Sequence, residues 1–63
     1  MSKLIFFTPY GFDNAEVAIV ASKITAVANI NGKANIFIDG MKDPCIVVED
    51  FAEVTEKLKE LIK

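Results

Sequence analysis

The sequence predicts an α+β domain, in which a small antiparallel β-sheet of four or five short strands in meander order is packed by one C-terminal helix. Three observations predict this class. An Asn31-Gly32 pair separates two runs of β-forming residues, as in a hairpin. Residues 50–62 carry apolar side chains at helical spacing behind a capping residue. The chain of 63 residues shows no repeat or linker, so residues 1–63 are expected to form a single domain.

The N-terminal part predicts two strands joined by a loop. Residues 3–8 are rich in β-forming types, and this strand ends before Pro9 because proline cannot donate a hydrogen bond to a ladder. Residues 9–14 collect proline, glycine, aspartate and asparagine, which is typical of a turn or exposed loop. Residues 16–21 could form a strand or a helix, since alanine and β-branched residues favour opposite states. We predict a strand, because the run is short and another β-like run, residues 24–30, soon follows.

The Asn31-Gly32 turn sets the register of the central hairpin. Both residue types tolerate the positive φ angles of a two-residue type I′ turn. Ile30 then faces Lys33 and, further from the turn, Thr25 faces Ile38. Because side chains alternate along a strand, one face carries Thr25, Val27, Ala34, Ile36 and Ile38, and the other carries Ile24, Ala26, Ala28, Ile30, Lys33, Asn35 and Phe37. Both faces are mainly apolar, so both need a cover.

The C-terminal part predicts a turn, a strand and a helix. Asp39-Gly40 and Asp43-Pro44 mark the turn, and residues 45–48 read as a strand. Asp50 is placed to cap the helix, and Glu53 follows three residues later, as in a capping box. The apolar stripe of this helix consists of Phe51, Val54, Leu58, Leu61 and Ile62.

One helix covers one face of such a sheet, so the second face needs another cover. Either the N-terminal strand folds over it or another copy of the protein does. Burial of apolar surface contributes about 90 kcal/mol and ordering the chain costs about 95 kcal/mol, so the monomer is near break-even. We therefore expect a homo-oligomer, with Ile24, Ile30 and Phe37 in the interface.

Missing residue types argue against several function classes. The chain has no histidine, and all seven cationic residues are lysines. Without an imidazole base we expect no enzyme activity and no catalytic residue. Without arginine, and with a net charge of −2, binding to nucleic acid is not expected. The apolar runs are too short to span a membrane, and a single cysteine fits a cytoplasmic location.

No cofactor, metal ion or disulfide is expected either. We interpret Cys45, the single cysteine, as a small buried residue at the start of a strand. Asp39, Asp43, Glu49 and Asp50 lie near two turns, but their spacing fits no EF-hand loop. They are interpreted as turn and helix-cap carboxylates.

Candidate binding residues lie in the first loop and beside the hairpin turn. Tyr10 and Phe12 flank Gly11, and an aromatic pair on a loop can contact a partner or a ligand. The alternative is that Phe12 enters the core and Tyr10 covers its edge. Lys33 and Asn35 follow the turn and offer polar contacts to a ligand.

Three segments, SKITAV (22–27), NGKANIFIDG (31–40) and IVVEDFAEV (46–54), resemble a group of small phage and bacterial proteins. The group includes the short flagellar motility proteins called FlbD-like or SwrD-like, which share an I-x-A-V pattern, a strand pair, a glycine turn and V-V-E-S-x-E-E-V before a helix. Asp50 stands where the family often has serine. The resemblance covers residues 20–60 and implies no catalytic residue. The N-terminal third departs from the flagellar branch, so a motor role is not implied.

Two functional hypotheses follow. The first is a non-catalytic, oligomeric binding or regulatory protein, a phage-encoded accessory protein that occupies a surface of a host protein. The second is an assembly that binds a small molecule or nucleotide between protomers, with Tyr10 stacking on the ligand and Lys33 or Asn35 making polar contacts. A ligand that binds only the folded state would raise the melting temperature and so separate the two.

Overall fold

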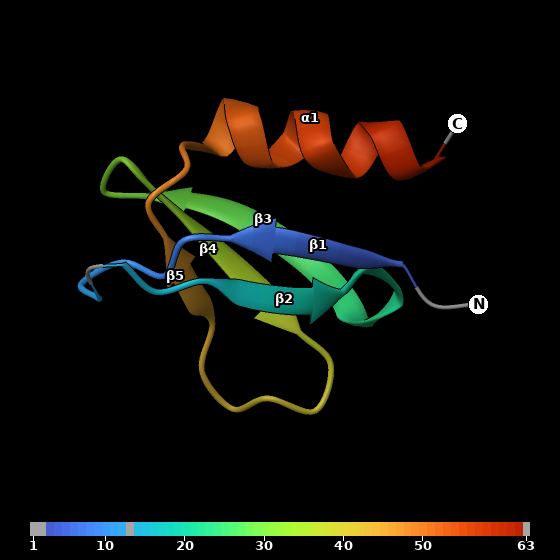
Figure 1. Ribbon diagram of the computed structural model, residues 1–63, viewed down its shortest axis with the longest axis horizontal. Helices are drawn as coiled ribbons and strands as arrows, with labels where there is room; N and C mark the ends of the chain where they lie inside the picture. The colour runs from blue at the N-terminus through green and yellow to red at the C-terminus, as the bar shows by residue number, and fades with distance from the viewer. Residues whose placement is uncertain (1–2, 13, 63) are drawn as a thin grey trace.

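The computed structural model describes residues 3–12 and 14–62, the last of these as backbone alone. Asp13, in the predicted first loop, and Lys63 lie outside the described residues. In chain order the elements are β1 (Leu4–Phe7), β2 (Val17–Val20), a 3₁₀ turn (Ala21–Lys23), β3 (Ile24–Ile30), β4 (Lys33–Ile38), β5 (Cys45–Val47) and α1 (Phe51–Ile62) (Figure 1). The predicted α+β class is confirmed, as is the strand assignment within residues 16–21.

The strands are divided between two antiparallel sheets, β1-β2 and β3-β4-β5. The chain passes from the first sheet to the second directly after β1. Pro9 pairs with Val47 of β5, while the Tyr10 N–H donates to the Ile46 carbonyl (2.9 Å) and the Val48 N–H donates to the carbonyl of residue 8 (2.8 Å). These bonds come from the residues around Pro9, so its missing N–H costs no hydrogen bond in this pairing. The segment therefore extends the second sheet beyond the point where β1 ends.

The central hairpin has the predicted turn but a corrected register at its far end. The Asn31-Gly32 turn has positive φ angles of 53° and 78°, as a type I′ turn requires. The predicted pairing of Thr25 with Ile38 is wrong, because Ile24 pairs with Ile38 around a β-bulge. The Thr25 hydroxyl donates to the Phe37 carbonyl at 3.2 Å. One extra residue in a strand moves everything before it to the opposite face, so Ile24 lies on the core side.

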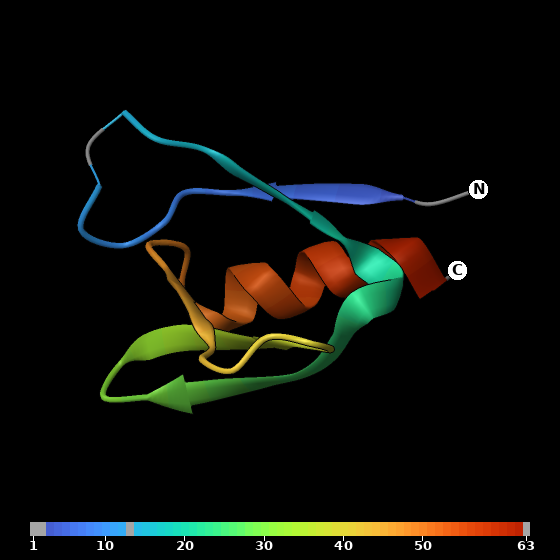
Figure 2. The same cartoon turned by 90° about the horizontal axis from the view of Figure 1, so that it is seen from below.

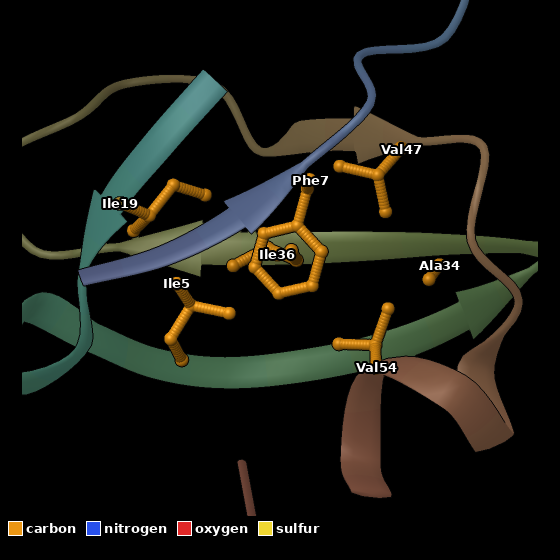
Figure 3. Packing of buried hydrophobic residues seen from close by; sticks show 7 residues of the cluster. All are labelled: Ile5, Phe7, Ile19, Ala34, Ile36, Val47 and Val54. Carbon is orange, nitrogen blue, oxygen red and sulfur yellow. The ribbon is translucent and has the colours of Figure 1, made fainter. Parts of the chain in front are cut away.

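The core lies on one side of the β3-β4-β5 sheet, where the β1-β2 hairpin and α1 both pack. The Phe7 ring lies over Ile36 at its centre (Figure 3). The buried apolar residues are Ile5, Phe7, Ile19, Ala34, Ile36, Val47 and Val54. Figure 2 shows α1 and the hairpin on the same side of β3 and β4. The N-terminal hairpin thus shares a face with the helix and leaves the other face of the sheet open.

Helix α1 is held by its cap and by one lysine. The Asp50 carboxylate accepts a hydrogen bond from the Glu53 N–H at 2.8 Å, which confirms the predicted cap. Lys57 donates to the Phe6 carbonyl at 3.0 Å, with its ammonium 5.2 Å from the centre of the Phe7 ring. This contact ties the middle of the helix to β1. Within the described part of the chain, no helix has the length and apolar character needed to cross a membrane.

Candidate protein-contact surface

The face of the β3-β4-β5 sheet that points away from the core is referred to as the outer face. Side chains alternate across a sheet, so residues next to buried core positions point to this side. Its members are Ala26, Ala28 and Ile30 of β3, Lys33, Asn35 and Phe37 of β4, and Ile46 of β5. Apart from Ile24, which the bulge moves away, this is the second hairpin face that the alternation predicts. No helix or strand of the described residues packs over it (Figure 2).

The outer face keeps large apolar side chains in solvent. Ile30 is 44% exposed, Phe37 37% and Ile46 40%, whereas Ile36, on the opposite side of the same sheet, is fully buried. Monomeric proteins seldom expose a contiguous apolar surface of this kind unless it contacts something.

Tyr10 joins the outer face through the pairing of residues 8–10 with β5. Pro9 pairs with a core residue of β5, so Tyr10 beside it pairs with Ile46 and shares its side of the sheet. The ammonium of Lys33 lies 4.6 Å from the centre of the Tyr10 ring, which is a cation-π contact. The structure thus brings together Tyr10 and Lys33, two predicted binding residues from distant parts of the chain.

Asn35 lies near the middle of the outer face. It pairs with Ala28 on one side and with Ile46 on the other, and it is only 6% exposed. Its side-chain amide donates one hydrogen bond, to the Lys33 carbonyl at 3.1 Å. The third predicted binding residue therefore lies among apolar neighbours, in the same surface as Tyr10 and Lys33.

Two predicted contact residues lie elsewhere. Phe12 is 66% exposed on the first loop, beyond the segment that pairs with β5, so it does not enter the core. Ile24, predicted in the interface, packs against the core because of the bulge at Thr25. Ile46 was not among the predicted contact residues, although extending the alternation of the hairpin to residues 45–48 would have placed it on this face.

Glu49 fixes the segment that carries Tyr10. Its carboxylate accepts hydrogen bonds from the Thr8 N–H (3.0 and 3.2 Å) and from the Thr8 hydroxyl (3.2 Å). Burial alone would raise the pKa of Glu49, but these hydrogen bonds and the nearby Lys57 charge outweigh it, so the pKa lies below its ordinary value. The interpretation of Glu49 as a simple turn carboxylate is therefore incomplete, because no local sequence signal joins residues 8 and 49.

A second candidate site, apart from the sheet face described above, is a groove between β3 and α1. It is an open groove of about 730 Å³, with a floor formed by residues 24–27 of β3. Leu58 and Leu61 of α1 line its wall, and Lys3 and Lys59 contribute the charged groups. Tyr10, Lys33 and Asn35 do not line it, and Ala26 is the one outer-face residue that the groove shares.

The described residues provide neither a reactive thiol nor a cluster of metal ligands. Cys45 starts β5 half-buried, and burial raises the pKa of its thiol above the ordinary value, which lowers its reactivity at neutral pH. Within residues 3–12 and 14–62, no three histidine, cysteine, aspartate or glutamate side chains gather where they could hold a metal ion.

Comparison with known proteins adds no relative to this chain. No family model, no curated protein and no solved structure matches it.

Proposed function

We propose that this chain is a non-catalytic binding protein that acts by protein-protein contact through the outer face. The observation that carries the proposal is the contrast between the two sides of one three-stranded sheet. One side is covered by α1 and by the β1-β2 hairpin, while the other presents Ile30, Phe37 and Ile46 to solvent.

The composition of the outer face supports contact with a protein. Interfaces are depleted of charge at their centre and enriched in aromatic residues, with polar groups at the rim. The outer face has Phe37 and Tyr10 as aromatic residues and one charged residue, Lys33, among its members. Its polar groups are few and fixed, which favours a specific fit over loose hydrophobic association.

The chemistry of the described residues supports a role without catalysis. The chain contains no histidine. Glu49 has a lowered pKa and is engaged with Thr8, and Cys45 has a raised pKa. Neither group is poised to exchange a proton or attack a substrate at neutral pH. The resemblance to small phage and bacterial accessory proteins points the same way.

Photo-crosslinking inside cells tests the proposal. A benzophenone amino acid is placed at Phe37 or at Ile46, and the matched control carries it at Leu4, which is 53% exposed on β1. We expect protein adducts from the two outer-face positions and few from position 4, because a benzophenone links only to groups in contact with it. Equal labelling from all three positions, or none from the outer face, would contradict the proposal.

The groove between β3 and α1 favours a second candidate function, binding of a small apolar molecule. Its volume of about 730 Å³ lies in the range of ligand pockets, and its lining is mainly apolar. A ligand there raises the melting temperature, and Leu58→Asn should remove that shift because it places an amide in the wall. A screen of fatty acids and other small apolar molecules that leaves the melting temperature unchanged counts against this candidate.

A further inference from the structure

The side chain of Asn35 leaves hydrogen-bonding capacity unused in an apolar setting. Its amide donates to the Lys33 carbonyl, but its oxygen accepts no hydrogen bond from the residues that the structure describes. Among these residues, no fully buried side-chain polar atom lacks a partner, so the Asn35 oxygen reaches the surface of the outer face. Asn35 is 94% covered as a residue, and an amide oxygen that stays open in such a setting is suited to a partner that supplies a donor there.

The side-chain amide of a second Asn35 can donate the hydrogen bond that the Asn35 oxygen does not accept from the described residues of its own chain. A primary amide both donates and accepts, so two asparagines related by a two-fold axis can exchange hydrogen bonds and satisfy each other. Any other partner must bring its own donor and acceptor to this spot. In a two-fold interface the same surface serves both subunits, and a single asparagine at its centre can fix the register of the contact.

The surroundings of Asn35 also suit a contact with themselves. Two alanines, Ala26 and Ala28, lie on β3, while large side chains lie on the neighbouring strands at Phe37 and Ile46. A two-fold axis that runs along β4 at Asn35 sets β5 of one copy over β3 of the other, so that Ile46 of one copy faces Ala28 of its partner. Sheets pack face to face in this way at a spacing of about 10 Å. The space beyond this side of the sheet is open in Figure 2.

The chain exposes more surface than a folded monomer of its mass is expected to expose. The chain exposes 4580 Å². A folded monomer of 6.9 kDa is expected to expose about 4000 Å². The excess of about 600 Å² approaches the ~800 Å² that each partner buries in an interface of standard size.

We infer that the outer face is covered by a second copy of this chain, with the two Asn35 amides paired on the two-fold axis. The inference rests on the proposed function, since it takes the outer face as the contact surface and names its occupant. It places Ile30, Phe37 and Ile46 inside the interface, and Lys33 with Tyr10 at its rim.

Sedimentation equilibrium of the purified chain, with variants, tests the inference. The wild-type chain is expected to have twice its 6.9 kDa mass at micromolar concentration. Asn35→Asp replaces the amide pair with two facing carboxylates, so the dissociation constant should rise at least ~100-fold at neutral pH. Protonation of the carboxyl should restore much of the affinity as the pH falls.

The matched control is Asn29→Asp, which makes the same change at an exposed position on β3 that pairs with Ala34 and so lies off the outer face. This variant should stay dimeric. Ile46→Glu provides a second test in case Asn35→Asp fails to fold, because Ile46 is exposed and its replacement should leave the circular dichroism spectrum unchanged.

A wild-type chain that stays monomeric at a concentration of about 100 μM overturns the inference. A dimer that Asn35→Asp and Ile46→Glu both leave intact overturns it as well. Crosslinking separates this failure from that of the proposed function. A monomeric chain with foreign proteins linked at Phe37 and Ile46 refutes the homodimer and leaves the proposed function standing. A monomeric chain without adducts at these positions refutes both.

Discussion

At the scale of single residues, Glu49 is the acidic group whose environment is most informative. It lies just after β5 and accepts three hydrogen bonds from Thr8, which lies just after β1. It therefore joins two segments 41 residues apart in sequence. Since Thr8 begins the segment that carries Tyr10, Glu49 positions part of the outer face without belonging to it.

This contact makes stability depend on pH in a defined direction. The pKa of Glu49 is lowered in the folded state, so its contribution is present at neutral pH and is lost as the pH falls through that folded pKa. We expect Glu49→Gln to lower the free energy of unfolding by ~1 kcal/mol at pH 7, a small effect because the carboxylate is screened by solvent. At strongly acidic pH the difference should vanish.

Urea unfolding of both chains across the pH range measures this difference. The other carboxylates titrate in both chains, so only the gap between the two stability curves reports on Glu49. A gap that widens toward acidic pH would show that the sign is wrong.

At the scale of elements, α1 begins at a cap that the sequence specifies. Asp50 accepts the Glu53 N–H at 2.8 Å, and this end of the helix follows directly on β5 through residues 48–50. The helix has 12 residues, which is too short to be stable in isolation. Its cap and its contact with the core therefore act together.

We expect Asp50→Ala to reduce stability by about 1 kcal/mol, because the first turn then has one more N–H without a partner. Thermal unfolding followed by circular dichroism measures the change. The control is Asp43→Ala, which removes the same charge from the exposed loop before β5 and should leave the melting temperature nearly unaltered. Equal losses in both variants would indicate an effect of net charge rather than of the cap.

The elements were predictable where a local pattern specifies them. The Asn31-Gly32 turn and the spacing of Val54 and Leu58 encode the hairpin and the helix in a few adjacent residues. The bulge at Thr25 has no such signal, because threonine fits a regular strand equally well. The pairing of residues 8–10 with β5 was also missed, since Pro9 marks the end of a ladder only for the bonds that need its own N–H.

At the scale of the whole molecule, a small core holds two sheets and a helix together. Ile36 lies at its centre under the Phe7 ring and is fully buried (Figure 3). For a chain of this length the total stability is ~3 to 9 kcal/mol, so one cavity can remove a large part of it.

We expect Ile36→Ala to cost about 2 to 5 kcal/mol and to leave a substantial unfolded population at 25 °C. The matched variant, Leu4→Ala, removes an apolar side chain that is 53% exposed, and it should cost less than ~1 kcal/mol. Urea midpoints of the two variants provide the comparison. Similar costs at the two positions would mean that β1 packs differently from Figure 3.

The outer face could be predicted from the sequence only in part. Alternation along the hairpin was enough to place Ile30, Asn35 and Phe37 on one surface. It could not show that the β1-β2 hairpin would choose the same side as α1, because that depends on packing between segments far apart in sequence. Nor could it show that Tyr10 would meet Lys33, which depends on the crossing of the chain from one sheet to the other.

Tyr10 also determines the intrinsic fluorescence of the chain. It is the only tyrosine of a chain that has no tryptophan, so essentially all near-ultraviolet emission originates from one ring. That ring lies 4.6 Å from the Lys33 ammonium, at the margin of the sheet. Intensity, anisotropy and quenching by iodide therefore report on this single location without any label. The intrinsic fluorescence of the unlabelled protein can therefore detect a molecule that binds beside Tyr10.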